Sequence, residues 1–354
     1  MRSVTHRIAD ARNQIKFLSA RVCCPLKSPS MITDSRLWKL NLLVAALVWA
    51  AIVALAALMG SWQGYGGRRF AIALGVAAVL FAFEFFLAAP GVLELAQRSV
   101  GGRILAPLVP LIAVIVYSSA VSGNPRLAVA GAAYAVVPAL LLAGAAGKSP
   151  GTWEDYVAVI VLWVPVQFQW MYWLFPYPPP LTHTLSILMA LSTGVAGFVV
   201  VRRLEGIGYA IEWRRGFTWN FGFHFIIYAA IAIFLGLRIG FLSFAPSLTR
   251  GPSLPISVLG ILFFTAWPEE FLFRGILQNL LSRTLKNEWA GLVVASVIFG
   301  LSHLHHAPYP NWKYVLMATI AGLFYGRAWM KTRSLVPATL VHASVDILWH
   351  ILFR

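Results

Sequence analysis

Long apolar stretches alternate with short polar connections along most of the chain, and this pattern predicts an all-α protein that crosses a membrane many times. A helix that spans the hydrocarbon core needs about 20 apolar residues, so the stretches after residue 38 accommodate roughly ten or eleven spans. They are expected near 39–59, 70–89, 104–121, 126–146, 155–174, 185–201, 218–243, 256–280, 289–304, 314–330 and 335–353. The predicted fold class is therefore a polytopic transmembrane helical bundle.

The polar connections divide this pattern into four parts. These are a basic N-terminal tail (1–38), an N-terminal membrane bundle (39–201), an amphipathic loop with a connecting span (202–251) and a C-terminal core (252–354). The basic, amphipathic stretch at 201–216 predicts a helix that lies along the inner membrane surface. A substrate-binding arm is the alternative interpretation of the same stretch.

The composition excludes a soluble globular domain, because 59% of the residues are hydrophobic and only 11% are charged. A net charge of +16 would suggest nucleic acid as a partner of a soluble protein, but here the basic residues lie in short connections and act as topology signals. With a cytoplasmic N-terminus, most Lys and Arg residues fall on the inside. We therefore expect a multi-pass protein of the inner (plasma) membrane that binds no nucleic acid. The adjacent Cys23 and Cys24 offer neither a disulfide framework nor a CxxC metal pair.

One apolar stretch, ILFFTAWPEEFLFRGILQNL at 261–280, carries three charged residues near its middle. A charged side chain at the centre of a bilayer costs roughly 2.5–3.5 kcal/mol on insertion scales, so such residues usually face a protein interior or a wet cavity. On a helix, Glu270 and Arg274 share one face at positions i and i+4 and can form an ion pair. Glu269 lies about 100° away around the helix and is left free. A free carboxylate in an apolar site is a candidate general base, whereas a purely structural Glu–Arg pair is the alternative.

The last hundred residues bring further polar side chains into apolar spans. His303 follows Phe299 by four residues, and Asp346 follows His342 by four, so each pair lies on one helical face. An Asp one turn from a His can accept its N–H and fix its tautomer. A shared buried polar site explains these positions together. By contrast, we expect Glu84 to lie near the membrane interface and His224 to be a packed core histidine.

These positions form three recognisable motifs. Glu269 to Arg274 matches EExxxR, Phe299 to His303 matches FxxxH, and His342 to Asp346 matches HxxxN/D. Together they resemble the CPBP family of intramembrane peptidases, which groups the CAAX prenyl endopeptidases with bacterial bacteriocin-processing and immunity proteins. The resemblance covers about residues 252–353 and places the active site in the last four spans.

The resemblance implies an intramembrane endopeptidase that acts on a membrane-associated or lipidated substrate. Glu269 would activate water together with His303, while His342 and the residue four further on would stabilise the oxyanion. That residue is Asp346, where the prenyl endopeptidases often carry Asn, and an ionised carboxylate cannot donate a hydrogen bond to an oxyanion. Asp346 is therefore expected to orient His342 or to stay protonated. Glu270, Arg274 and Phe299 would have structural and orienting roles.

The cofactor and the class of function have alternatives. A metal-free mechanism is favoured because no HExxH spacing is present, but a zinc site could instead be formed by Glu269, His303, His342 and Asp346. His305 and His306 are expected to lie at the membrane interface. A proton-coupled transporter would also need buried Glu, His and Arg, and a catalytically silent scaffold or immunity protein is a third possibility.

Overall fold

The computed structural model describes residues 35–246 and 254–353 of the 354-residue chain. The basic tail predicted at 1–38 falls almost entirely outside the described residues, and so do Cys23 and Cys24. The residues that the structure describes divide at residue 40 into two units, and those from Asn41 onward belong to the second. The second unit contains both the N-terminal membrane bundle and the C-terminal core that the sequence predicts.

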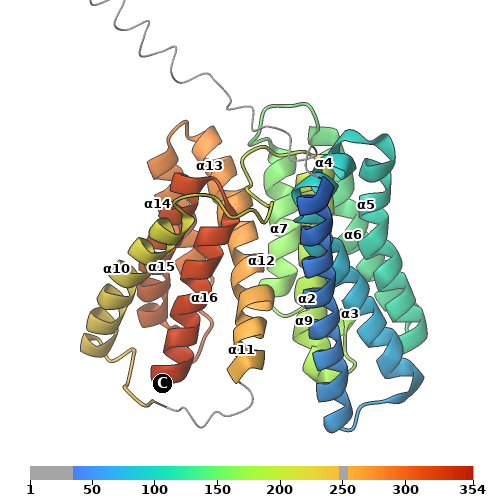
Figure 1. Cartoon of the computed structure of the whole chain (residues 1–354), viewed down its shortest axis with the longest axis horizontal. Helices are drawn as coiled ribbons and strands as arrows, with labels where there is room; N and C mark the ends of the chain where they lie inside the picture. Colours follow the sequence, from blue (N-terminus) through green and yellow to red (C-terminus); the bar gives the residue numbers. More distant parts are fainter. Residues whose placement is uncertain (1–34, 247–253, 354) are drawn as a thin grey trace, which may run out of the picture. The chain divides into compact units, whose positions relative to one another are not determined.

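The described residues form an all-helical protein, which confirms the predicted fold class (Figure 1). The α-helices are α2 (Ser35–Trp62), α3 (Gly67–Leu87), α4 (Pro90–Arg98), α5 (Val100–Tyr117), α6 (Pro125–Ala145), α7 (Trp153–Gln167), α8 (Met171–Leu174), α9 (Thr182–Gly194), α10 (Phe217–Arg238), α11 (Leu254–Ile261), α12 (Trp267–Glu270), α13 (Asn279–Thr284), α14 (Glu288–Leu301), α15 (Trp312–Thr332) and α16 (Leu335–Leu352). The shorter helical segments are η2 (Ser118–Ser122), η3 (Pro179–Leu181), η4 (Val195–Val201), η6 (Leu262–Ala266) and η7 (Phe271–Gln278). All of these except the 3₁₀ turn η3 are π-helical.

Eight helical segments in the described part of the chain are long and apolar enough to cross a membrane, so this is a multi-pass membrane protein. The other three expected spans correspond to α7, α14 and α15. The first two have only 15 and 14 residues. The third is longer but carries Lys313, Arg327 and Lys331, which lower its hydropathy.

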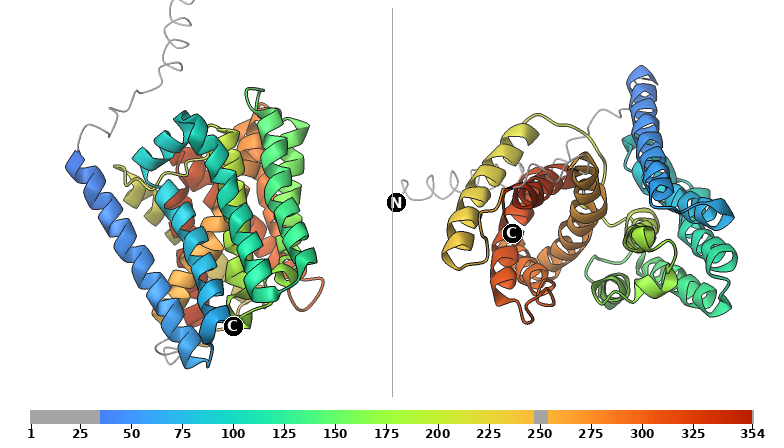
Figure 2. Two further views of the ribbon diagram at one scale, coloured as in Figure 1. Left: turned by 90° about the vertical axis from the view of Figure 1, so that its right-hand side faces the viewer. Right: turned by 90° about the horizontal axis from the view of Figure 1, so that it is seen from below.

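The C-terminal core consists of α14, α15 and α16 together with the continuous helix 254–284 that runs from α11 to α13, and α10 of the connecting span packs against α15 and α16. Figure 2 shows these helices, coloured yellow to red, grouped around a common centre. Polar residues cap the N-termini of α14, α15 and α16. The side chains of Asn287, Asn311 and Ser334 accept hydrogen bonds from the first backbone N–H groups of α14, α15 and α16, respectively. These caps define where the helices that carry the site begin.

Small residues allow α14 and α15 to approach each other closely. A Cβ atom added to Gly322 of α15 would lie only 2.9 Å from the Cβ of Ser296 of α14. Gly300 and Gly326 likewise face side chains of neighbouring helices with no room for a Cβ. Small residues at helix contacts are typical of membrane proteins, in which association depends on van der Waals packing.

Glu84 of the N-terminal bundle and Arg202, directly after it, are buried polar groups with partners on other helices. Glu84 of α3 is 3% exposed, and its Oε1 accepts a hydrogen bond of 2.7 Å from Ser192 of α9. Glu84 is therefore packed inside the bundle, where a hydroxyl on a neighbouring helix satisfies its carboxyl group, and its depth relative to the membrane interface stays a prediction. Arg202 forms a second buried contact, with its Nε 2.8 Å from Asp155 Oδ1.

The stretch 201–216 contains no helix beyond the end of η4 at Val201, so the predicted surface helix was wrong. Its backbone instead bonds to both groups of helices. Ile211 N–H donates to the Ala88 carbonyl at 2.8 Å, and the Ile207 carbonyl accepts from Trp329 Nε1 at 3.0 Å. These bonds hold the segment in an extended path between the bundle and the core. His224, in contrast, is buried as expected, with Nδ1 2.8 Å from the Asn220 carbonyl.

Candidate active site

The acidic residues of the site lie on a helix with irregular geometry. Two π-helical segments, η6 and η7, flank the single α-turn that carries Glu269 and Glu270. Pro268 lacks the N–H that a regular helix would bond to the carbonyl of residue 264, which favours such a local change of hydrogen bonding. The sequence predicted a regular α-helix here. π-Helical turns occur frequently at functional sites.

The ion pair expected between Glu270 and Arg274 is present and almost completely buried. Arg274 Nε lies 3.2 Å from Glu270 Oε2, and the two side chains are 1% and 0% exposed. The guanidinium carbon lies 4.5 Å from the ring centroid of Phe299 and 5.6 Å from that of Tyr325. None of the Arg274 nitrogens has a hydrogen-bond partner among the described residues. The carboxylate charge and the faces of aromatic rings therefore hold this cation in place.

His342 connects this buried pair to the rest of the site. Its Nδ1 lies 2.9 Å from Glu270 Oε1, and because a carboxylate only accepts, Nδ1 is the donor. Its Nε2 lies 3.4 Å from Asp346 Oδ2 and 3.8 Å from Glu269 Oε2. The sequence predicted Asp346 as the partner that orients His342. The structure adds Glu270 as a closer one, so Glu270 contacts both Arg274 and His342.

His303 lies just beyond the end of α14, and its ring is fixed by its own helix. Nδ1 is 2.8 Å from the Phe299 carbonyl, which can only accept. The proton is therefore assigned to Nδ1, and Nε2 of the neutral ring is left as an acceptor. The rings of Phe299 and Tyr314 contact the imidazole, with centroid distances of 4.9 and 4.6 Å.

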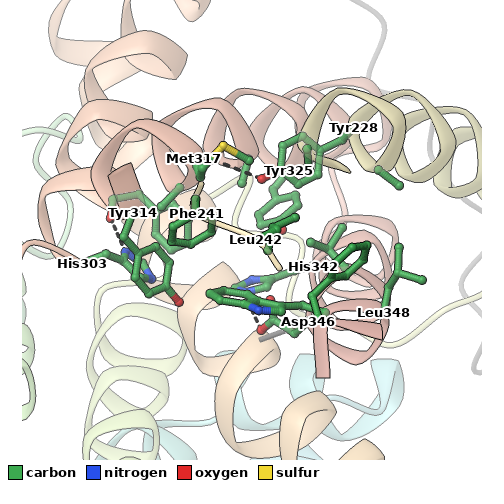
Figure 3. A pocket seen from close by; sticks show the side chains of 18 of the residues that line it. Tyr228, Phe241, Leu242, His303, Tyr314, Met317, Tyr325, His342, Asp346 and Leu348 are labelled. Carbon is green, nitrogen blue, oxygen red and sulfur yellow. Dashed lines mark hydrogen bonds and ion pairs between the residues drawn. The ribbon is translucent and has the colours of Figure 1, made fainter. Parts of the chain in front are cut away.

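A cavity of about 200 Å³ joins these groups, and we call it the core cavity. It is lined by Glu269, His303, His342 and Asp346, and Figure 3 shows the two histidines and the aspartate facing it, with Tyr314 beside His303. The Glu269 side chain is 33% exposed and its Oε2 has no hydrogen-bond partner. A water molecule needs only about 10–15 Å³ of such space. The core cavity therefore has room for water beside the partly exposed Glu269 side chain.

Several residues of the site were not predicted from the sequence. Tyr314, Tyr325 and Trp349 line the core cavity with aromatic rings, and His306 lines it from the loop after α14. Partial burial, together with the neighbouring His305, lowers the pKa of His306. The aromatic residues occur in stretches that resemble ordinary membrane helices, so no local signal separated them from lipid-facing positions.

The zinc alternative concerns the side chains of Glu269, His303, His342 and Asp346. In the part of the chain that the structure describes, no three His, Cys, Asp or Glu side chains are arranged so that they could hold a metal ion. His303 directs Nδ1 to a backbone carbonyl, and His342 directs Nδ1 to Glu270. The ring nitrogens that remain are the two Nε2 atoms.

Comparison with known proteins agrees with the resemblance read from the motifs. Residues 251–348 match the family model described as type II CAAX prenyl endopeptidase Rce1-like. No curated protein and no solved structure matches the chain. The matched region contains the site residues from Glu269 to Asp346, whereas the N-terminal bundle lies outside it. The C-terminal region of this multi-pass membrane protein is therefore a CAAX-type intramembrane protease domain of the Rce1-like family.

Proposed function

We propose that the protein hydrolyses a peptide bond of a membrane-associated or lipidated substrate, with water activated by Glu269 and His303 and without an essential metal. The observation that carries this proposal is the arrangement around the core cavity. The Glu269 side chain lines that cavity and is 33% exposed, and His303 has Nε2 left as an acceptor. A water molecule between them would have two acceptors for its protons.

In the proposed reaction, the Glu269 carboxylate takes one proton from the water as the oxygen attacks the carbonyl carbon of the substrate. The carbonyl oxygen becomes an oxyanion, and the tetrahedral intermediate then expels the amine. Glu269 returns the proton to that amine, so protons balance over the cycle. This transfer follows the usual double role of a base that later acts as an acid.

His342 is the proposed donor to the oxyanion. Its Nδ1 is occupied by Glu270, so Nε2 is the ring atom available to the core cavity. Asp346, 3.4 Å from Nε2, can hold a shared proton at that atom until the oxyanion forms. Arg274 acts indirectly, because it fixes Glu270 and thereby the ring of His342.

The proposal predicts cleavage by purified protein in lipid vesicles. The probe is a set of synthetic membrane-associated peptides, with and without a farnesylated C-terminal cysteine, and products are identified by mass spectrometry. The E269Q variant keeps the size and hydrogen bonding of the side chain but loses the base, so turnover should fall roughly 10²- to 10⁴-fold.

Glu84 provides a matched control, because it is a buried carboxyl group outside the site. The E84Q variant makes the same chemical change and should retain activity. Equal activity of E269Q and the wild type would contradict the proposed role of Glu269. A wild type that cleaves none of the peptides would favour a non-catalytic scaffold or immunity protein. The same vesicles test the proposed cytoplasmic N-terminus by protease protection of an N-terminal tag.

A further inference from the structure

A second cavity borders the helix that carries Glu269, and helices outside the matched family region also line it. This bundle cavity has a volume of about 170 Å³. Leu162 and Val166 of α7 and Ile187 and Ala190 of α9 contribute apolar walls. Its opposite wall comes from the segment 268–273 and the loop after α14. The N-terminal bundle thus provides half of a cavity that reaches the candidate active site.

The two cavities share the residues at the centre of the site. Glu269, His303 and His306 line both the core cavity and the bundle cavity. The carboxylate and the imidazole proposed to activate water therefore lie where the two spaces meet. A peptide that is cut at this point must extend away from the scissile bond in two directions.

Specific contacts fix α7 against the site. Gln167 Nε2 donates a hydrogen bond of 2.6 Å to the carbonyl of Ser302, the residue before His303. The ring of Trp163 contacts that of Phe273 edge-on, with centroids 5.7 Å apart. The wall of the bundle cavity that α7 provides therefore contacts the segments that carry His303 and Phe273.

The lining of the bundle cavity indicates what it would hold. Apart from the shared residues at its inner end, the walls are aliphatic and aromatic side chains with Gln167 as the main polar exception, and Gln167 is already bonded to the backbone. Such a space stabilises an apolar group through burial and offers little to a charged one.

We propose that the bundle cavity is a substrate-binding site that takes an apolar side chain on one side of the scissile bond, while the core cavity takes the residues on the other side. This inference rests on the proposed peptidase function. It makes α7 and α9, which lie outside the matched region, determinants of substrate specificity.

Photo-crosslinking tests this inference directly. Val166 and Val345 are matched probes, because both are half-buried valines and each lines one cavity only, the bundle cavity and the core cavity, respectively. Each is replaced in the E269Q chain by a small diazirine-bearing amino acid, and a peptide cleaved by the wild type is added. Mass spectrometry then locates the crosslinked peptide residue. Ile160, on the exposed face of α7, is the control position.

We expect Val166 to crosslink to residues on one side of the scissile bond, Val345 to residues on the other side, and Ile160 to neither. Crosslinks from Val166 and Val345 to the same side, or no crosslink from Val166, would overturn the inference. If the wild type cleaves none of the peptides, a peptide that binds without being cleaved is used instead. Crosslinks from Val166 and Val345 to separate parts of that peptide would then support two binding sites and contradict the proposed peptidase function alone. The two proposals can therefore fail separately.

Filling the bundle cavity gives a second readout. The A190L variant places a larger side chain in the wall contributed by α9. Cleavage of peptides with a large apolar residue on the Val166 side should fall by at least roughly tenfold, whereas peptides with alanine there should be cut as before. The exposed Ala133 of α6 allows the same substitution away from the cavity, and A133L should leave both rates unchanged. A uniform loss for all peptides in A190L would contradict a side-chain-specific site.

Discussion

Replacing Arg274 by methionine tests whether the buried pair behaves as the geometry requires. Arg274 and Glu270 are 1% and 0% exposed, with Nε 3.2 Å from Oε2. The R274M variant keeps an apolar side chain of similar length but removes the cation. The Glu270 carboxylate is then left in apolar surroundings with His342 as its remaining partner.

The expected cost follows from these contacts. Removing one partner of a buried ion pair destabilises a protein by roughly 3–5 kcal/mol, because the other charge is left uncompensated. The loss of the guanidinium from the faces of Phe299 and Tyr325 adds on the order of 1–2 kcal/mol. The R274M/E270Q double variant removes the stranded charge as well, so its free energy of unfolding should exceed that of R274M by at least roughly 2 kcal/mol.

The measurement is equilibrium unfolding of the purified protein in mixed detergent micelles, followed by circular dichroism. A surface pair of the same spacing is the control: Arg98 and Glu94 are also at i and i+4, 3.5 Å apart, but 76% and 39% exposed. The R98M change should cost no more than about 1 kcal/mol. A double variant that is as unstable as R274M, or less stable, would refute the argument that R274M strands a carboxylate.

Three further outcomes are expected. Exhaustive chelation should leave peptide cleavage intact, whereas loss of activity that zinc restores would reassign the polar side chains as metal ligands. The G322L change should destabilise the fold by about 1–3 kcal/mol through overpacking against Ser296, while G75A, at a helical glycine with open space around it, should be neutral or stabilising. Removing the carboxyl group in D346A should lower turnover roughly 10- to 100-fold without loss of folding, and D346N should recover part of it, because an amide can still hydrogen-bond to His342.

Local spacing was sufficient to predict the parts of the site that lie within one helix. The pairing of Glu270 with Arg274 and of His342 with Asp346 depends on i and i+4 positions, and both contacts are present. The helices themselves follow from apolar runs of membrane-spanning length. Ten of the eleven predicted spans correspond to a helix or a continuous helical segment of the structure, and the span at 155–174 is divided between α7 and α8 by a turn at 168–170.

Contacts between helices could not be predicted in this way. The hydrogen bond from His342 to Glu270 joins residues that are 72 positions apart, and no periodicity in either helix encodes the distance between them. The prediction from the sequence therefore gave Glu270 only one partner, Arg274. In the structure, Glu270 connects the buried cation to a histidine of the core cavity.

The prediction of a surface helix at 201–216 was wrong for a different reason. Its basic and apolar residues were interpreted as the two faces of a surface helix. Arg202, however, forms a buried ion pair with Asp155, and Gly206 and Gly208 adopt positive φ angles that a helix does not use. The charge of Arg202 was expected to face solvent, but in the structure the Asp155 carboxylate of α7 neutralises it inside the protein.

The bundle cavity shows the limit of sequence interpretation most clearly. Its walls are formed by residues such as Leu162, Val166 and Ala190, which are also the residue types of a helix face that contacts lipid. The hydropathy of such a residue is the same in a cavity wall and on a lipid-facing surface. The apolar spans of the N-terminal bundle therefore gave no sign of a role in the active site. These side chains lie next to the proposed reacting groups because α7 packs beside His303, and the hydrogen bond from Gln167 to Ser302 fixes that packing. If substrate choice depends on that wall, chains with the same three motifs will differ in specificity through residues that no motif contains.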